Sequence, residues 1–174
     1  MARILLTWEF GGGMGHLNQF PLLVDRLIAR GHRLIVAVPQ DTVMDQAARL
    51  FGAKRGVSIR AGHSWPPPTD PRARQAPTHS LADVLHLFGY HDPQRLGQAA
   101  RIWTQIVDAE KPDLVIADFA PTLAVCGAAG RPVLALGNGY AIPPGGQMLP
   151  PIRPWQETLK AFSRANEGEI LMAV

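Results

Sequence analysis

A histidine and an aspartate far apart in the chain are the two side chains best suited to proton transfer. His16 follows the glycine-rich stretch EFGGGMG (residues 9–15), and Asp118 follows the apolar segment DLVIA (residues 113–117). An imidazole accepts a proton near neutral pH, and a carboxylate beside it fixes its tautomer and stabilises the imidazolium that forms. The two residue types therefore suit a general base and its orienting partner, provided that the fold brings them together.

The glycine-rich stretch lies between an apolar run of strand length, residues 3–8, and a segment with apolar residues at helical spacing, residues 17–30. Glycines in such a strand–loop–helix turn permit positive φ and the close approach of another molecule. The stretch matches neither well-known phosphate loop: it has no Gly-Lys-Ser/Thr, and His16 stands where G-x-G-x-x-G needs its third glycine. Free N–H groups at the helix start could still hold an anion.

Strand-like and helix-like segments alternate along most of the chain. The strand-like segments are 3–8, 33–38, 57–60, 113–117 and 133–136; the helix-like segments are 17–30, 41–51, 80–90, 92–110 and 121–129. Asp41 is a plausible N-cap for the second helix, and Asp92 followed by Pro93 is a start signal for the fourth. This alternation predicts an α/β fold with a mostly parallel sheet covered by helices on both faces.

A doubly wound, Rossmann-like layout follows, because crossovers between parallel strands are right-handed. In the common strand order 3-2-1-4-5, strands one and four are neighbours at the switch point, where ligands bind beyond the carboxyl ends of the strands. His16 and Asp118 would face each other there, and the positive helix end would disfavour a charged imidazole. The alternative is a helix-start histidine bonded to backbone, with Asp118 capping the next helix. Position in the sequence leaves both open.

Composition narrows the class of protein. The chain has 174 residues, which is long enough for one domain with a core. Of these residues 47% are hydrophobic and 18% charged, and the net charge is +3. Basic residues are scattered among acids, which argues against a nucleic-acid partner. The single cysteine, Cys126, cannot form an intramolecular disulfide and lies in an apolar segment, so buried packing is expected. No run suits a transmembrane segment or a signal peptide, and the expected location is cytoplasmic.

Two irregular segments complete the chain. Residues 61–79 contain five prolines together with His63, Trp65 and His79, and a loop this long is usually functional or disordered. After the last strand, a Gly/Pro-rich segment contains Asn138 and Tyr140, and an amphipathic helix is expected over about 155–172. A metal site is not expected, since His79, His86 and His91 share no helical face and no cysteine or carboxylate cluster joins them.

Two segments together resemble a known family. The segment GGGMGHLNQFPLLVDRLIARGHRLIVAVP (residues 11–39) is similar to the opening of GT-B-fold glycosyltransferases of the UDP-glycosyltransferase-like group. The segment KPDLVIADFAPTLAVCGAAGRPVLAL (residues 111–136) resembles a second motif of that family, "PDLVI-D…A…A…G-P". The likeness covers residues 3 to about 141, and the Gly15-His16 turn together with Asp118 is its most specific part.

The resemblance implies transfer of a sugar, with inversion, from a nucleotide-sugar to an acceptor hydroxyl. His16 corresponds to the base that deprotonates the acceptor, and Asp118 to the residue that orients this histidine. The nucleotide-sugar, expected to be UDP-linked, is a co-substrate, and no cofactor is expected. Acceptor contacts are expected from Gly13, Met14, Gly15, His63, Trp65, Asn138 and Tyr140. For Trp65 the alternative is packing against the proline loop, and for Asn138 a plain turn.

The family has two Rossmann-like domains, and this chain resembles the acceptor-binding one. The expectation is a single acceptor-type domain over residues 1–174, without the donor-binding domain, so that a donor-domain chain would be the partner. The other partner would be a small-molecule or lipid acceptor, with peripheral membrane contact left open. The alternatives are a non-catalytic small-ligand-binding module, a truncated and inactive transferase fragment, and a Rossmann-type nucleotide-binding enzyme. The last is disfavoured by the missing third glycine.

Overall fold

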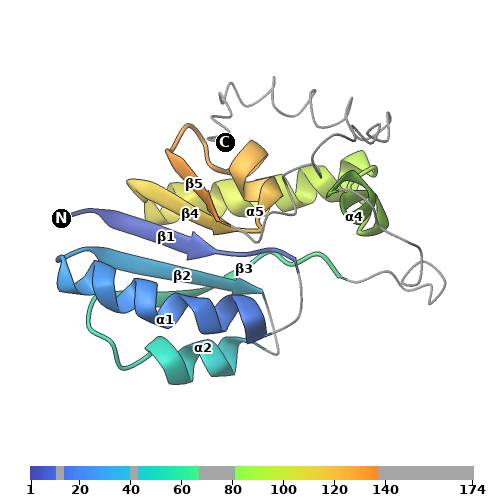
Figure 1. Cartoon of the computed structure of the whole chain (residues 1–174). Coiled ribbons are helices and arrows are strands. Elements are labelled where there is room, and N and C mark those ends of the chain that lie inside the picture. The colour runs from blue at the N-terminus through green and yellow to red at the C-terminus, as the bar shows by residue number, and fades with distance from the viewer. Residues whose placement is uncertain (11–13, 40–42, 67–80, 137–174) are drawn as a thin grey trace, which may run out of the picture.

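The computed structural model describes residues 1–10, 14–39, 43–66 and 81–136 (Figure 1). Five strands form one parallel sheet in the order β3-β2-β1-β4-β5. The strands are β1 Arg3–Thr7, β2 Arg33–Pro39, β3 Val57–Gly62, β4 Leu114–Asp118 and β5 Val133–Leu136. The predicted doubly wound, Rossmann-like α/β fold is therefore confirmed, including the placement of β1 beside β4.

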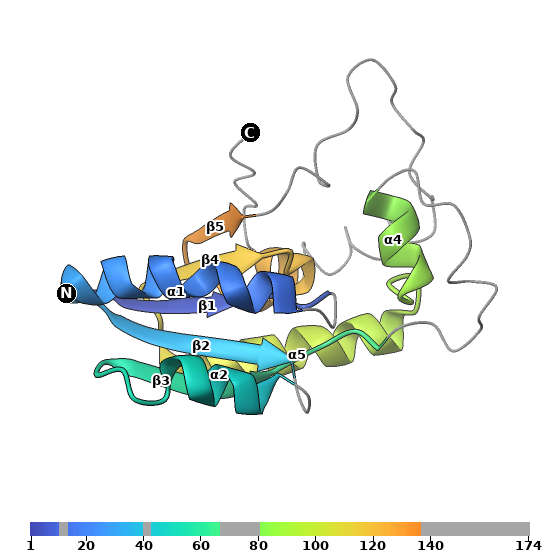
Figure 2. The same cartoon turned by 60° about the horizontal axis from the view of Figure 1, so that its bottom comes forward.

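Helices cover both faces of the sheet. They are α1 Met14–Ala29, α2 Met44–Phe51, α4 Leu81–Leu87, α5 Pro93–Glu110 and the short π-helix η1 Leu123–Gly127. Figures 1 and 2 show α1 and α2 on one face and α5 on the other, while α4 lies away from the sheet, beyond the carboxyl ends of its strands. Right-handed crossovers between parallel strands produce this double winding.

The core has two layers because successive residues of a strand face opposite sides. On one face, Leu6 and Ile116 pack with residues of α1 that include Phe20. On the other face, Leu5 and Trp103 belong to a second cluster, which joins β1, β2 and β4 to α5 and η1. Burial of each large aliphatic side chain contributes about 1.5–3 kcal/mol. The central strands, apolar on both faces, therefore anchor the strand ends that carry the candidate site.

Capping explains one helix boundary and corrects another. Asp92 caps α5 as predicted: its Oδ1 accepts from the backbone N–H of Gln94 at 2.9 Å, and Pro93 takes the first helical position. The prediction that Asp41 caps the second helix is wrong, because α2 begins at Met44 and Val43 is its N-cap. Val43 is buried in the core and makes no side-chain cap bond. Packing, rather than capping, starts this helix.

Two predicted boundaries shift at the carboxyl edge of the sheet. The segment predicted as an irregular loop from residue 61 begins later, because β3 continues to Gly62, which pairs with Pro39. A Cβ on Gly62 would lie 2.7 Å from the Trp103 ring, so the strand end packs tightly on α5. The helix predicted over 121–129 begins at residue 121 as predicted and ends at residue 127, and its residues Leu123–Gly127 form η1. The helix predicted over 155–172 and most of the loop predicted over 61–79 lie outside the described residues.

Cys126 is buried in η1, as expected for a packing residue. Burial, and then the charge of Glu9, raise the pKa of its thiol to about 12. The thiol is therefore protonated at neutral pH and a poor nucleophile. Within the described ranges, no helix is long and apolar enough to cross a membrane.

Candidate functional site

His16 and Asp118 meet at the switch point between β1 and β4. His16 lies in the first turn of α1, and Asp118 is the last residue of β4. His16 Nδ1 and Asp118 Oδ2 are 2.7 Å apart, within hydrogen-bond distance. The His16 side chain is 20% exposed, whereas the Asp118 side chain is 5% exposed. The carboxylate is shielded and the imidazole still reaches the surface, as a base that meets a substrate requires. The contact matches the sequence-based expectation, and its catalytic role stays a prediction.

The indole of Trp8 lies against the imidazole of His16. The two rings are stacked, with centroids 6.0 Å apart and planes at 14°. Trp8 is fully buried and packs edge-on against Phe20 of α1 at 5.6 Å. A rigid buried ring against one face restricts rotation of the imidazole. Two contacts therefore orient His16, a hydrogen bond to Asp118 and a ring contact with Trp8.

Glu9 follows Trp8 directly in the chain, and its side chain is buried. Its side chain accepts the backbone N–H of Thr122 on Oε2 at 3.0 Å and that of Leu123 on Oε1 at 2.8 Å. The Tyr90 hydroxyl lies 3.5 Å from Oε2. The N–H groups at a helix start lack intrahelical partners, and here the carboxylate satisfies two of them at the start of η1. Glu9 thus connects the segment that follows β1, Trp8-Glu9, to the turn that follows β4.

Burial raises the pKa of Glu9 from 4.5 to about 7, against the opposing effect of its hydrogen bonds to Thr122 and Leu123. Glu9 is 1% exposed, and the contacts described for it are with hydroxyl and N–H groups rather than with a cation. Ionising a buried carboxyl group costs free energy when its partners are neutral hydrogen-bond donors rather than a cation. Perturbed carboxyl groups of this kind cluster at functional sites.

An aromatic cluster covers the carboxyl ends of the strands. It consists of Phe10, Trp65, Phe88, Tyr90 and Phe119. Trp65 is 4% exposed, its ring lies parallel to Phe10, and its indole N–H donates to the Thr122 hydroxyl at 3.1 Å. The Tyr90 hydroxyl bonds to the same hydroxyl. In this structure Trp65 is a packed and hydrogen-bonded part of the cluster, and most of the proline loop named in the alternative interpretation lies outside the described residues.

His63 lies beside Trp65 with the ring centroids 5.3 Å apart. Burial, assisted by the positive charge of Arg95, lowers its pKa to about 4, so the imidazole is neutral at physiological pH. Its Nδ1 is buried and has no hydrogen-bond partner among the described residues. Buried polar atoms without partners are uncommon in native proteins and call for an explanation. The indole nitrogens of Trp8 and Trp103 are likewise buried without a partner among the described residues.

The remaining predicted acceptor residues lie mostly outside the described part of the chain. Gly13, Asn138 and Tyr140 are not described, and Met14 is described only as the first residue of α1. Gly15 is exposed, and a Cβ built on it would meet no atom of the described residues within 4 Å. The described fold therefore does not need a glycine at this position.

Outside the site, the rings of His86 and His91 lie tilted against each other with centroids 4.3 Å apart, and His91 Nδ1 lies 3.2 Å from the His86 carbonyl oxygen. Across the described ranges, no group of three or more metal-ligating side chains comes together.

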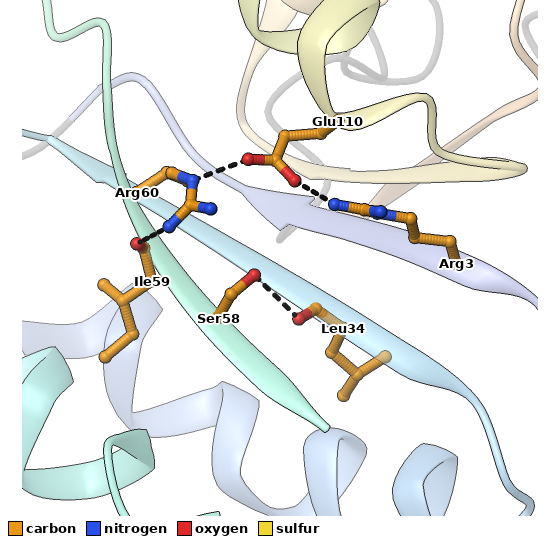
Figure 3. Close-up of polar contacts among 6 residues, drawn as sticks. All are labelled: Arg3, Leu34, Ser58, Ile59, Arg60 and Glu110. Carbon is orange, nitrogen blue, oxygen red and sulfur yellow. Dashed lines mark hydrogen bonds and ion pairs between the residues drawn. The ribbon is translucent and has the colours of Figure 1, made fainter. Parts of the chain in front are cut away.

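A hollow of about 360 Å³ lies at the opposite edge of the sheet, where β1, β2 and β3 begin. Arg3, Arg33 and Ser58 contribute to its lining, and the described lining residues bear no imidazole or carboxylate. Figure 3 shows the neighbouring contacts, in which the guanidinium groups of Arg3 and Arg60 converge on the carboxylate of Glu110. This hollow lacks the groups for proton transfer, and the candidate site stays at the switch point.

Solved glycosyltransferases share this fold. The calicheamicin glycosyltransferase CalG4 aligns with 95% of this chain and 43% of its own, at 18% identity and a TM-score of 0.58. The spinosyn rhamnosyltransferase SpnG, complexed with thymidine diphosphate, aligns over 94% of this chain and 41% of its own, at 18% identity and a TM-score of 0.55. The glycosyltransferase SsfS6 of Streptomyces sp. SF2575 aligns with 95% of this chain and 44% of its own, at 19% identity and a TM-score of 0.50. The sequence matches no protein-family model and no curated protein.

These similarities establish a glycosyltransferase-like α/β fold, so the resemblance noted in the sequence is confirmed at the level of the fold. The chain spans less than half of the length of each of these three structures. One fold hosts many activities, so function has to be argued from the site itself.

Sequence reasoning missed Glu9, Trp8 and Thr122. The available signal was the tripeptide Trp8-Glu9-Phe10, in which a single carboxylate stands between two aromatic residues directly after an apolar strand. A charged residue in such a position is either exposed or held by specific partners. Only the fold shows that its partners are backbone N–H groups that follow β4.

Proposed function

We propose that this chain is the acceptor-binding part of a glycosyltransferase, with His16 as the general base and Asp118 as its orienting partner. The observation that carries the proposal is the 2.7 Å contact between His16 Nδ1 and Asp118 Oδ2. It lies at the switch point of a doubly wound sheet, where ligands of this fold class bind. The glycosyltransferase-like fold supports the choice of reaction.

The geometry supports a defined path for the proton. With Nδ1–H donated to Asp118, the lone pair of His16 is on Nε2, which accepts the proton of an acceptor hydroxyl. The hydroxyl oxygen forms a bond to the anomeric carbon of the sugar while the bond from that carbon to the nucleotide diphosphate breaks. Asp118 then stabilises the imidazolium. A positioned base of this kind contributes about 10²–10⁴-fold to the rate.

A second domain or chain would supply the donor site. The aligned glycosyltransferases are more than twice as long as this chain, so a donor-binding part is the missing component of the proposal. The nucleotide-sugar is a co-substrate rather than a cofactor. UDP-linked sugars are the first choice of donor, and sugars linked to thymidine diphosphate, the nucleotide that SpnG holds in its structure, are the second.

The acceptor would lie against His16 and His63. His63 is half-buried beside Trp65, and its low pKa keeps the ring neutral, so that its exposed part can contact an acceptor hydroxyl. Trp65 would support His63 from the aromatic cluster rather than stack on the acceptor, because its ring is already packed. The backbone at Gly15 would let the acceptor approach the start of α1.

The test is a transfer assay with UDP- and TDP-sugars and with phenolic, lipid and sugar acceptors. It is run on the chain alone and mixed with a separately expressed donor domain. The variant is His16→Ala, and the matched control is His32→Gln, because the His32 side chain accepts the backbone N–H of Ala2 where β1 and β2 begin, away from the switch point. Transfer that His16→Ala lowers at least 10²-fold and His32→Gln preserves supports the proposal. Transfer that persists in His16→Ala would overturn the assignment of the base.

A second outcome would favour a different class of protein. If acceptors bind the wild-type chain but no mixture gives transfer, the site is a small-ligand-binding module. Isothermal titration with the same acceptors measures that binding directly, and the half-buried, neutral ring of His63 is the observation that makes it worth measuring.

A further inference from the structure

The turn that follows Asp118 is held in an unusual conformation. Phe119, the next residue, has φ of +51°, in the left-handed region that residues with a Cβ seldom adopt. Such a conformation costs about 1–3 kcal/mol and persists only where the surroundings over-determine it. Because Phe119 directly follows Asp118, relaxation of this turn would redirect the Asp118 carboxylate.

Glu9 makes three contacts with this turn. Its backbone N–H donates to the Phe119 carbonyl at 3.3 Å, and its two carboxylate oxygens accept from the N–H groups of Thr122 and Leu123. Glu9 also follows Trp8, whose ring stacks on His16. One residue therefore contacts both halves of the His16–Asp118 pair through its neighbours, and does so from inside the protein.

We propose that Glu9 is a positioning residue that holds Asp118 in hydrogen-bonding geometry with His16. Its two oxygens clamp the start of η1, the clamp keeps Phe119 in the left-handed conformation, and that conformation fixes the Asp118 side chain against Nδ1 of His16. The catalytic meaning of this contact rests on the proposed function, but the contact and its dependence on Glu9 do not. Substituting Glu9 leaves two buried N–H groups without acceptors, which favours a different turn.

A merely structural role for Glu9 predicts a loss of stability and no change at His16. Glu110 is the matched control, because it is also a buried glutamate with two hydrogen-bonded partners, Arg3 and Arg60, but lies at the other edge of the sheet (Figure 3). Its substitution should destabilise the protein without reaching the switch point. The two glutamates thus separate positioning from general stability.

The experiment is nitrogen-15 and proton NMR of the histidine side chains in the full chain, without donor or acceptor. The wild type should show His16 protonated on Nδ1, with a slowly exchanging, downfield proton bonded to Asp118. Asp118→Asn, which removes the carboxylate, shows how the His16 signals look without it. Glu9→Ala should lose the Nδ1 proton signal and move His16 toward the Nε2-protonated tautomer, whereas Glu110→Ala should leave both signals as in the wild type.

Glu9→Gln covers the case in which Glu9→Ala does not fold. The amide keeps the shape and one acceptor oxygen, so it should weaken the Nδ1 proton signal by at least half rather than abolish it. A folded Glu9→Ala or Glu9→Gln protein with wild-type His16 signals would overturn the proposal. Since no sugar transfer is needed for this readout, the absence of transfer by the wild-type chain mixed with a donor domain would count against the proposed function and leave the test of Glu9 intact.

Discussion

Two buried glutamates at opposite edges of the same sheet have pKa values shifted in opposite directions. Glu9 is 1% exposed at the carboxyl edge, where burial raises its pKa to about 7. Glu110 is 7% exposed at the amino edge; burial also raises its pKa, but hydrogen bonds and charge from Arg60 and Arg3 outweigh this and leave it below 4.5. The difference lies in the partners, guanidinium groups in one case and backbone N–H and hydroxyl groups in the other.

The comparison shows that ionised Glu110 stabilises the fold, whereas ionised Glu9 costs it stability. An ion pair with two arginines, both about half exposed, keeps Glu110 charged at modest cost. A charge buried against dipoles alone costs stability, and such costs are concentrated at functional sites. The perturbed carboxyl group at the carboxyl edge therefore supports the proposed site there, whereas Glu110 at the amino edge is held in an ion pair with Arg3 and Arg60.

The largest expected difference between the two edges is in catalysis. In a reconstituted transferase, Asp118→Asn should lower kcat by about 10²–10⁴-fold, because the amide cannot stabilise the His16 imidazolium. Glu110→Gln should leave kcat within about twofold, since it acts at the other edge. Steady-state kinetics under saturating donor measures both. Equal losses in the two variants would mean that global stability, rather than the site, governs the rate.

The pH dependence of stability should expose opposing contributions from Glu9 and His63. For Glu9, the folded state binds a proton between pH 4.5 and about 7 that the unfolded state lacks, so stability falls as pH rises through this range. For His63, the unfolded state binds the extra proton between about pH 4 and 6.5, so stability falls as pH drops. Each contribution is at most about 3.5 kcal/mol at ~1.4 kcal/mol per pKa unit.

Single variants should unmask these slopes. Glu9→Gln should become less stable on acidification from pH 6.5 to 4.5, because of these two opposing contributions only that of His63 remains. His63→Gln should become less stable on going from pH 4.5 to 7, because only the Glu9 contribution remains. Urea unfolding across this range measures both, and the double variant serves as the control with neither slope. Parallel pH profiles for the two single variants would contradict the assigned pKa shifts.

Removal of the ion pair of Glu110 with Arg3 and Arg60 should have a smaller effect, on the free energy of unfolding. Glu110→Ala should lower the free energy of unfolding by about 1–2 kcal/mol at pH 7, since it removes charged hydrogen bonds from half-exposed arginines. The pKa of Glu110 is lowered in the folded state, so this stabilisation is present above about pH 4.5 and lost below it. Urea unfolding at pH 7 and at pH 3 measures the loss. An equal loss at both would show that packing, not charge, explains the role of Glu110.

The smallest effect is expected at Gly15. Gly15→Ala should stabilise the chain by about 0.5–1 kcal/mol, because alanine is the better helix former and no described atom lies in its way. Thermal unfolding measures this gain. If the acceptor approaches the backbone here, the same variant should raise the KM for acceptor, so stability and function would move in opposite directions. A stabilised variant with unchanged KM would remove Gly15 from the acceptor site.

The strand order and most element positions could be predicted from the sequence. Alternating apolar strands and amphipathic helices are local patterns, and the handedness of crossovers turns them into a doubly wound sheet. The same rule placed the ends of β1 and β4 together, and with them His16 and Asp118. The start of α2 was missed because core packing of Val43 outweighs a capping signal.

The sequence by itself therefore determined the sheet and its switch point, and it placed His16 and Asp118 at neighbouring strand ends; the structure decided that the two side chains meet. The tertiary structure alone decided that Glu9 joins the turn after β4, that Trp65 is packed rather than open, and that His63 is half-buried and neutral. The physical reason is that repeating patterns report which face of an element is apolar. Hydrogen bonds between segments distant in the chain, and the loss of hydration that shifts a pKa, exist only once those segments have packed together.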